Sequence, residues 1–139
     1  MHPKILFAVL LLVAVPAIAA GPLQSAAPGK SGCEQTADLS GLNEFTCALK
    51  PSRKAVLYRF IATFAGVHDD TRVTMEQTLN GRLLTCAEGS KTDFTGEEVG
   101  TSSVDCRFVV PGDMKTQSVL KVRMRWGHGD LVGIELIRG

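Results

Sequence analysis

The clearest structural signal of this sequence is the stretch RVTMEQTLNGRLL, residues 72–84. Apolar and polar residues alternate from Arg72 to Leu79, which is the period of a half-buried strand. Asn80-Gly81 follows directly, and this dipeptide favours a type I′ turn because that turn needs positive φ at both central residues. The stretch therefore predicts a β-hairpin whose register pairs Leu79 with Arg82 and Met75 with Cys86.

The hairpin register indicates where the cysteines point. Cys86 falls on the same face as Met75, which is the apolar face, and Cys106 shares the apolar face of residues 104–110. An even number of cysteines in an exported domain predicts disulfides, whereas the C-x-x-C spacing of zinc sites is absent from the sequence. We therefore expect no metal or other cofactor, and we expect the pairs Cys33–Cys47 and Cys86–Cys106.

Alternating patterns continue on both sides of this stretch. Residues 55–65 form the longest strand candidate, and residues 119–126 and 130–137 flank the turn Gly127-His128-Gly129. A three-residue loop there pairs Val122 with Ile134 and places Lys121 opposite Glu135. About seven short strands separated by Gly, Asn, Asp and Pro turns predict an all-β fold, a small antiparallel β-sandwich or a small barrel, held by two disulfides.

The N-terminal segment has the features of a secretory signal. Lys4 precedes the apolar run of residues 5–15, and Pro16 then leads to the small-residue sequence Ala17-Ile18-Ala19. The run is shorter than the ~20 apolar residues that a bilayer-spanning helix needs. The sequence therefore predicts a cleaved signal peptide over residues 1–19, a flexible leader over 20–32 and a single β-sandwich domain over 33–139.

Export and charge narrow the functional classes. A signal peptide and paired cysteines predict a periplasmic or secreted protein. The whole chain has 15 Lys and Arg against 14 Asp and Glu, and removal of Lys4 with the signal leaves no net charge. Nucleic acid and anionic membranes attract clustered positive charge, so a neutral chain argues against both as the main partner. We also expect no stable membrane insertion after signal cleavage.

A basic stripe is the strongest candidate for a partner face. Lys121, Arg123 and Arg125 alternate with apolar residues, which places them together on the solvent side of one strand. Arg107 is the candidate for extending this surface across the sheet. A basic stripe suits an acidic protein partner, although charged sheet faces also occur without any binding role.

The loop His68-Asp69-Asp70 is a weaker candidate site. An imidazole and two carboxylates in a loop are groups that bind cations, but a Ca²⁺ site needs six to eight oxygen ligands. Asp side chains also stabilise ordinary turns by hydrogen bonding to the backbone. His128, between two glycines, is similarly interpreted as a solvated turn residue because no nucleophile can be placed beside it.

Three functional hypotheses remain. The sequence favours a non-enzymatic exported binding or accessory domain, either a protein-interaction module or an inhibitor, whose partner is a protein of the envelope or the extracellular space. The first alternative is a carbohydrate- or Ca²⁺-binding β-sandwich module, and the second is a small hydrolase. No catalytic residues are predicted, since the chain contains none of the common catalytic sequence motifs.

Overall fold

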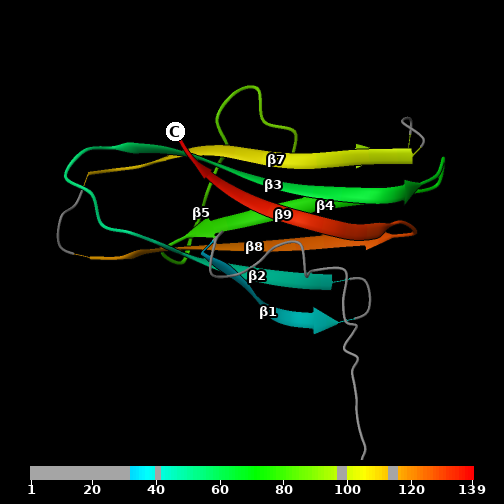
Figure 1. Cartoon of the computed structure of the whole chain (residues 1–139), viewed down its shortest axis with the longest axis horizontal. Helices are drawn as coiled ribbons and strands as arrows, with labels where there is room; N and C mark the ends of the chain where they lie inside the picture. Colours follow the sequence, from blue (N-terminus) through cyan, green and yellow to red (C-terminus); the bar gives the residue numbers. More distant parts are fainter. Residues whose placement is uncertain (1–31, 40–41, 97–99, 113–115) are drawn as a thin grey trace, which may run out of the picture.

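Strands dominate the part of the chain that the structure, a computed structural model, describes: residues 32–39, 42–96, 100–112 and 116–139. The predicted signal peptide and almost all of the predicted leader lie outside these residues. The described residues form two antiparallel sheets, which confirms the all-β sandwich prediction (Figure 1). No helix able to cross a bilayer occurs among them.

The larger sheet holds six strands in the order β1–β2–β8–β4–β5, with β6 paired to another part of β4. The smaller sheet has β3 between β7 and β9. The strands of the larger sheet are β1 (Cys33–Leu39), β2 (Leu42–Leu49), β4 (Arg72–Leu79), β5 (Arg82–Leu83), β6 (Asp93–Thr95) and β8 (Ser118–Gly127). Those of the smaller sheet are β3 (Val56–Val67), β7 (Gly100–Val110) and β9 (Asp130–Arg138).

The inner faces of the two sheets form one apolar core. Alternate residues of each long strand point inward, and the largest fully buried side chains include Phe45, Phe60, Phe64 and Phe108. Phe64 of β3 meets Trp126 of β8 edge-on, with ring centroids 5.1 Å apart, so an aromatic pair joins the two sheets. Such pairs add about 0.5–1.5 kcal/mol beyond the burial of their area.

The Asn80-Gly81 hairpin forms with the predicted turn residues. Asn80 and Gly81 have φ angles of 52° and 81°, and Leu79 pairs with Arg82. The pairing predicted between Met75 and Cys86 is wrong, because the Met75 N–H donates to the Thr92 carbonyl at 2.9 Å. The chain leaves β4 after Leu84, and Cys86 points toward β7 instead.

Residues 84–92 form a strap that joins the two sheets along one side of the sandwich. The Ala87 N–H donates to the Arg107 carbonyl at 2.7 Å, and the backbones of Lys91 and Asp105 exchange hydrogen bonds of 3.1 and 2.7 Å. The predicted disulfides Cys86–Cys106 and Cys33–Cys47 are both present. The first ties the strap to β7, and the second joins directly paired residues of β1 and β2.

The hairpin predicted between residues 119–126 and 130–137 is wrong. β8 pairs with β2 and β4, whereas β9 pairs with β3 in the other sheet. The turn through His128 and Gly129, with φ angles of 50° and 90°, carries the chain from one sheet to the other. β8 directs alternate apolar residues into the core, whereas β9 buries Leu131 and Ile134 across a register shift and leaves Val132 exposed. Apolar residues of both strands reach the core in either arrangement, so the apolar pattern alone did not distinguish the two.

We predict that the Cys86–Cys106 bond stabilises the fold more than the Cys33–Cys47 bond. Replacing both Cys86 and Cys106 by Ala should lower the free energy of unfolding by about 2–5 kcal/mol, because this bond joins the strap to the other sheet and closes the longer loop, with a sequence separation of 20 against 14. The matched double replacement of Cys33 and Cys47 should cost less, since β1 remains hydrogen bonded to β2. Urea unfolding of the two variants measures both costs, and a larger loss in the second variant would contradict the prediction.

Candidate functional site

The basic stripe, Lys121, Arg123 and Arg125, lies on the outer face of β8 near the middle of the larger sheet. All three side chains are exposed, while the intervening Val122 and Met124 are fully buried. The stripe therefore has the orientation that its sequence pattern indicates.

Acids from the two neighbouring strands partly neutralise this stripe. The Nε atom of Arg123 lies 3.0 Å from Oε2 of Glu44 on β2, and Glu76 of β4 is opposite Arg123 in register. Glu135, predicted to lie opposite Lys121, instead pairs with Ile61 in the smaller sheet. That correction follows from the change of sheet between β8 and β9.

A hollow of about 400 Å³ lies beside Arg123 and Arg125 of the stripe. Arg125 has Leu42 of β2 on one side in register and Thr74 of β4 on the other. Among the described residues neither Arg125 nor Lys121 has an ion-pair partner. The Arg125 guanidinium thus borders the hollow without a paired acid, while the Glu76 carboxylate lines the same hollow. Its lining residues are Leu42, Thr74, Met75, Glu76, Arg123 and Arg125.

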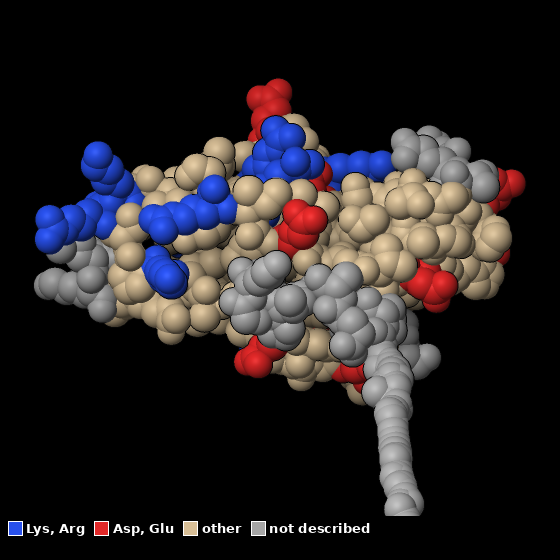
Figure 2. All heavy atoms as spheres, viewed as in Figure 1, with Lys and Arg blue, Asp and Glu red and all other residues tan. Residues whose placement is uncertain are grey.

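Charge is distributed unevenly along the molecule. Lys and Arg side chains gather at one end, on the left in Figure 2, where β3 begins and β9 ends. The exposed bases of this basic end are Lys50, Arg53, Lys54 and Arg138. At the opposite end, the turns after β3 and β8 carry the exposed acids Asp69, Asp70 and Asp130.

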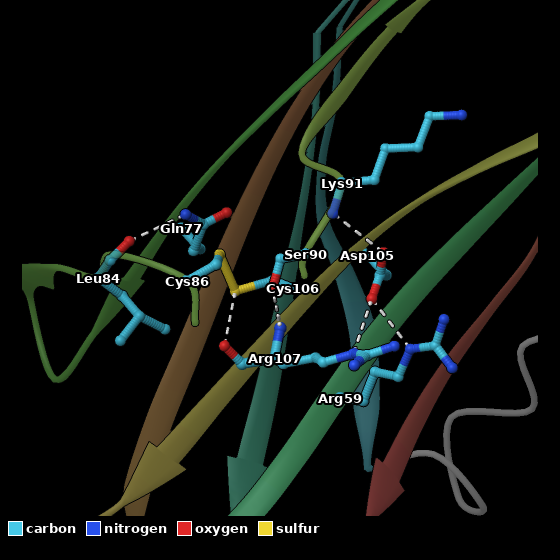
Figure 3. The surroundings of a disulfide bond; sticks show 9 residues. All are labelled: Arg59, Gln77, Leu84, Cys86, Ser90, Lys91, Asp105, Cys106 and Arg107. Carbon is cyan, nitrogen blue, oxygen red and sulfur yellow. Dashed lines mark hydrogen bonds and ion pairs between the residues drawn. A yellow bond between two sulfur atoms is a disulfide. The ribbon is translucent and has the colours of Figure 1, made fainter. Parts of the chain in front are cut away.

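Arg107 lies on β7 of the smaller sheet and does not extend the basic stripe. Together with Arg59 of β3 it holds the buried carboxylate of Asp105, with Nε to Oδ2 distances of 3.6 Å for Arg107 and 2.9 Å for Arg59 (Figure 3). The Lys91 N–H of the strap donates to the other oxygen of Asp105 at 3.1 Å. Two guanidinium groups are thus fixed side by side by one acid, an arrangement that the sequence analysis missed because it depends on the β3–β7 register.

A second hollow, of about 530 Å³, lies between β4 and the strap. Gln77 lines it, and its Nε2 donates to the Leu84 carbonyl at 2.9 Å. Its Oε1 is the buried side-chain atom that has no hydrogen-bond partner among the described residues. This oxygen is closed off from solvent, so the hollow presents mainly the backbone and small side chains of the strap.

The structure brings together two candidates that the sequence left separate. Nδ1 of His128 lies 2.7 Å from Oδ2 of Asp70, across the turns after β8 and β3. The hydrogen bond from His128 holds the pKa of Asp70 below its ordinary value, and partial desolvation of the carboxyl opposes this. The turn before Asp70 is stabilised by the Thr71 hydroxyl, which accepts a hydrogen bond from the His68 N–H at 2.9 Å.

These residues do not form a recognisable metal centre. Within the described residues, no cluster of three or more His, Cys, Asp or Glu side chains is arranged to hold a metal ion. His68, Asp69 and Asp70 are all exposed, and Asp70 is already hydrogen bonded to His128.

Comparison with known proteins gives no relative to draw on. No family model matches this chain, and no curated protein or solved structure matches it either.

We predict that His128 controls the titration of Asp70. Replacing His128 by Gly, which suits the positive φ of that position, should raise the pKa of Asp70 toward the ordinary carboxyl value. Because the wild-type pKa is lowered, the stabilisation from this pair is present at neutral pH and is lost as the pH falls through the pKa of Asp70. Carboxyl-detected NMR titration measures the shift. His68→Ala is the control and should shift Asp70 less, while an unchanged pKa in His128→Gly would show that the pair does not persist in solution.

We also predict that the loop His68-Asp69-Asp70 binds no metal tightly. Its exposed side chains offer too few fixed oxygen ligands for Ca²⁺. Thermal melting curves recorded with and without a chelator should coincide. A lower melting temperature in the presence of chelator, absent in Asp70→Ala, would contradict this.

Proposed function

We propose that this chain is an exported, non-enzymatic binding domain whose partner is a protein of the envelope or the extracellular space. The observation that carries the proposal is the hollow beside Arg125 on the outer face of the larger sheet. The partner group that fits it is a carboxylate of an acidic segment.

The chemistry of the hollow favours recognition of a carboxylate. An Arg guanidinium presents a planar fork of N–H donors that matches the two oxygens of a carboxylate. Arg123 is occupied by Glu44, so Arg125 is the group left to receive an external acid. Leu42 and Thr74 on either side supply an apolar contact and a hydroxyl.

The supporting structure suits a binding surface. β8 lies between β2 and β4 and has eight residues in register with each of them, so the stripe stands on a strand that is paired on both sides. A fixed backbone reduces the ordering that binding requires. Exposed positive charge would mainly speed association with an acidic partner and make binding sensitive to salt.

We predict that Arg125→Ser weakens partner binding and leaves folding nearly intact. The purified domain is immobilised and exposed to the envelope fraction of its own cell at low and at high salt. The wild-type protein should retain a partner at low salt that it releases at high salt, and Arg125→Ser should retain several-fold less. Once the partner is purified, it should associate more slowly with Arg125→Ser than with the wild-type protein.

Arg82→Ser is the matched control, since it removes an exposed Arg from the larger sheet away from the hollow. It should bind as the wild type does. A partner whose binding ignores both salt and Arg125→Ser would show that the stripe is a solvated surface. Equal losses in the two variants would show that net charge matters and the hollow does not.

A further inference from the structure

We propose that the outer face of the smaller sheet, at the basic end of the molecule, docks on the headgroup surface of an anionic phospholipid bilayer. The inference is independent of the Arg125 hollow, which lies on the other sheet. The contact is peripheral and involves no insertion of a helix.

The centre of this face is an exposed apolar patch formed by Leu57, Val109 and Ile137. These side chains are 48%, 52% and 43% exposed. Leu57 and Val109 are paired across β3 and β7, and Ile137 is paired with Arg59, the residue two along from Leu57. The three therefore protrude from neighbouring positions of one sheet face. Isolated exposed apolar residues are common, but a contiguous group is a sign of a contact surface.

Two oriented arginines border the patch. Arg59 and Arg107 are directly paired across β3 and β7, and Asp105 engages the Nε of each. An Arg has five N–H donors, so contacts through Nε leave the terminal nitrogens available for another anion. The Asp105 side chain is only 9% exposed, while those of Arg59 and Arg107 are 41% and 44% exposed (Figure 3). The buried acid therefore positions the two arginines, and a phosphate can approach from outside.

Further bases surround the patch at the basic end. Arg53 and Lys54 precede β3. Arg138 follows Ile137 at the end of β9, but it is in register with the buried Tyr58 and so points to the opposite side of the sheet, where it adds only to the general charge of this end. All three side chains are exposed, and Figure 2 shows the concentration of Lys and Arg at this end. Residues 50–57, 109–112 and 137–139 contain no acidic side chain, and Glu135, two residues before Ile137 on the same face, is the exposed acid of β9 beside the patch.

This combination suits a lipid surface better than an acidic protein. Bases from three segments border short aliphatic side chains, and both headgroup attraction and shallow apolar burial contribute to binding at a bilayer surface. Protein hot spots instead centre on aromatic or Arg anchors that fill pockets. Among the described residues, none of the exposed large apolar side chains is aromatic.

The test is co-sedimentation of the exported chain with vesicles. Two sets are compared, phosphatidylcholine alone and phosphatidylcholine with about one third phosphatidylglycerol. The chain should bind only the anionic vesicles and should be released by salt. The double variant Arg53→Gln/Lys54→Gln should reduce the partition coefficient roughly tenfold, since each base near the surface contributes to binding. Val109→Ser/Ile137→Ser should reduce it several-fold as well.

Matched controls come from the larger sheet. Arg82→Gln/Lys121→Gln removes two exposed bases and Leu83→Ser/Val119→Ser removes two exposed apolar side chains, and neither should alter vesicle binding. All variants carry the same N-terminus, checked by mass spectrometry, so a contribution from that segment cancels. Circular dichroism and melting temperature establish that each variant is folded.

Three outcomes would overturn the proposal. The first is equal binding to the two kinds of vesicle, and the second is an equal loss in Arg82→Gln/Lys121→Gln and in Arg53→Gln/Lys54→Gln. The third is an absence of vesicle binding together with Arg53- and Lys54-dependent binding of a polyglutamate peptide, which would assign this face to an acidic protein. None of these outcomes depends on whether Arg125 binds a partner.

Discussion

The attachment of the strap to β7 is the interaction on which the rest of the structure depends. Each sheet has one apolar face, and neither is stable in water unless the other covers it. Backbone hydrogen bonds from Ala87 and Lys91 hold the strap on β7, while Leu84 and Thr92 keep its two ends on β4. The Cys86–Cys106 bond fixes the same connection covalently. The two sheets are thereby held together along one side of the sandwich, and the positions of both outer faces follow.

Residue alternation was sufficient to predict which side of most strands faces the core. It gave the inward position of Cys106 and the outward positions of the basic stripe, whereas in β9 the alternation is interrupted, with Leu131 buried and Val132 exposed. The Asn80-Gly81 turn also fixed a true register, because a two-residue loop leaves little freedom. These features are local, and the sequence carries them directly.

The order of the strands within each sheet could not be predicted in the same way. The apolar face of a strand is buried equally well whether the next strand of the chain lies beside it in the same sheet or across the core in the other sheet. The apolar pattern of β8 and β9 therefore fits a hairpin and a change of sheet alike. An acid of β9, Glu135, was accordingly expected opposite Lys121, whereas the acid that contacts the stripe is Glu44 of β2, which engages Arg123. The same ambiguity concealed the pairing of Arg59 with Arg107 over Asp105. The net charge of the chain was similarly uninformative about its charged surfaces, because the positive charge of the basic end and the negative charge of the opposite end cancel in the sum.

The central position of β3 has a consequence for how the chain acquires its fold. Its partners, β7 and β9, both lie far along the chain, and β9 follows every other strand. Pairings between such distant segments form slowly, because the entropy cost of closing a long loop must be met before the strand contacts can offset it. Until then Phe60 and Phe64 remain in contact with water, and β3 presents two unpaired edges. Slow pairing of β3 would suit the export proposed above, because a chain that crosses a membrane through a pore must be unfolded, and until β9 arrives the unpaired edges of β3 are open to aggregation.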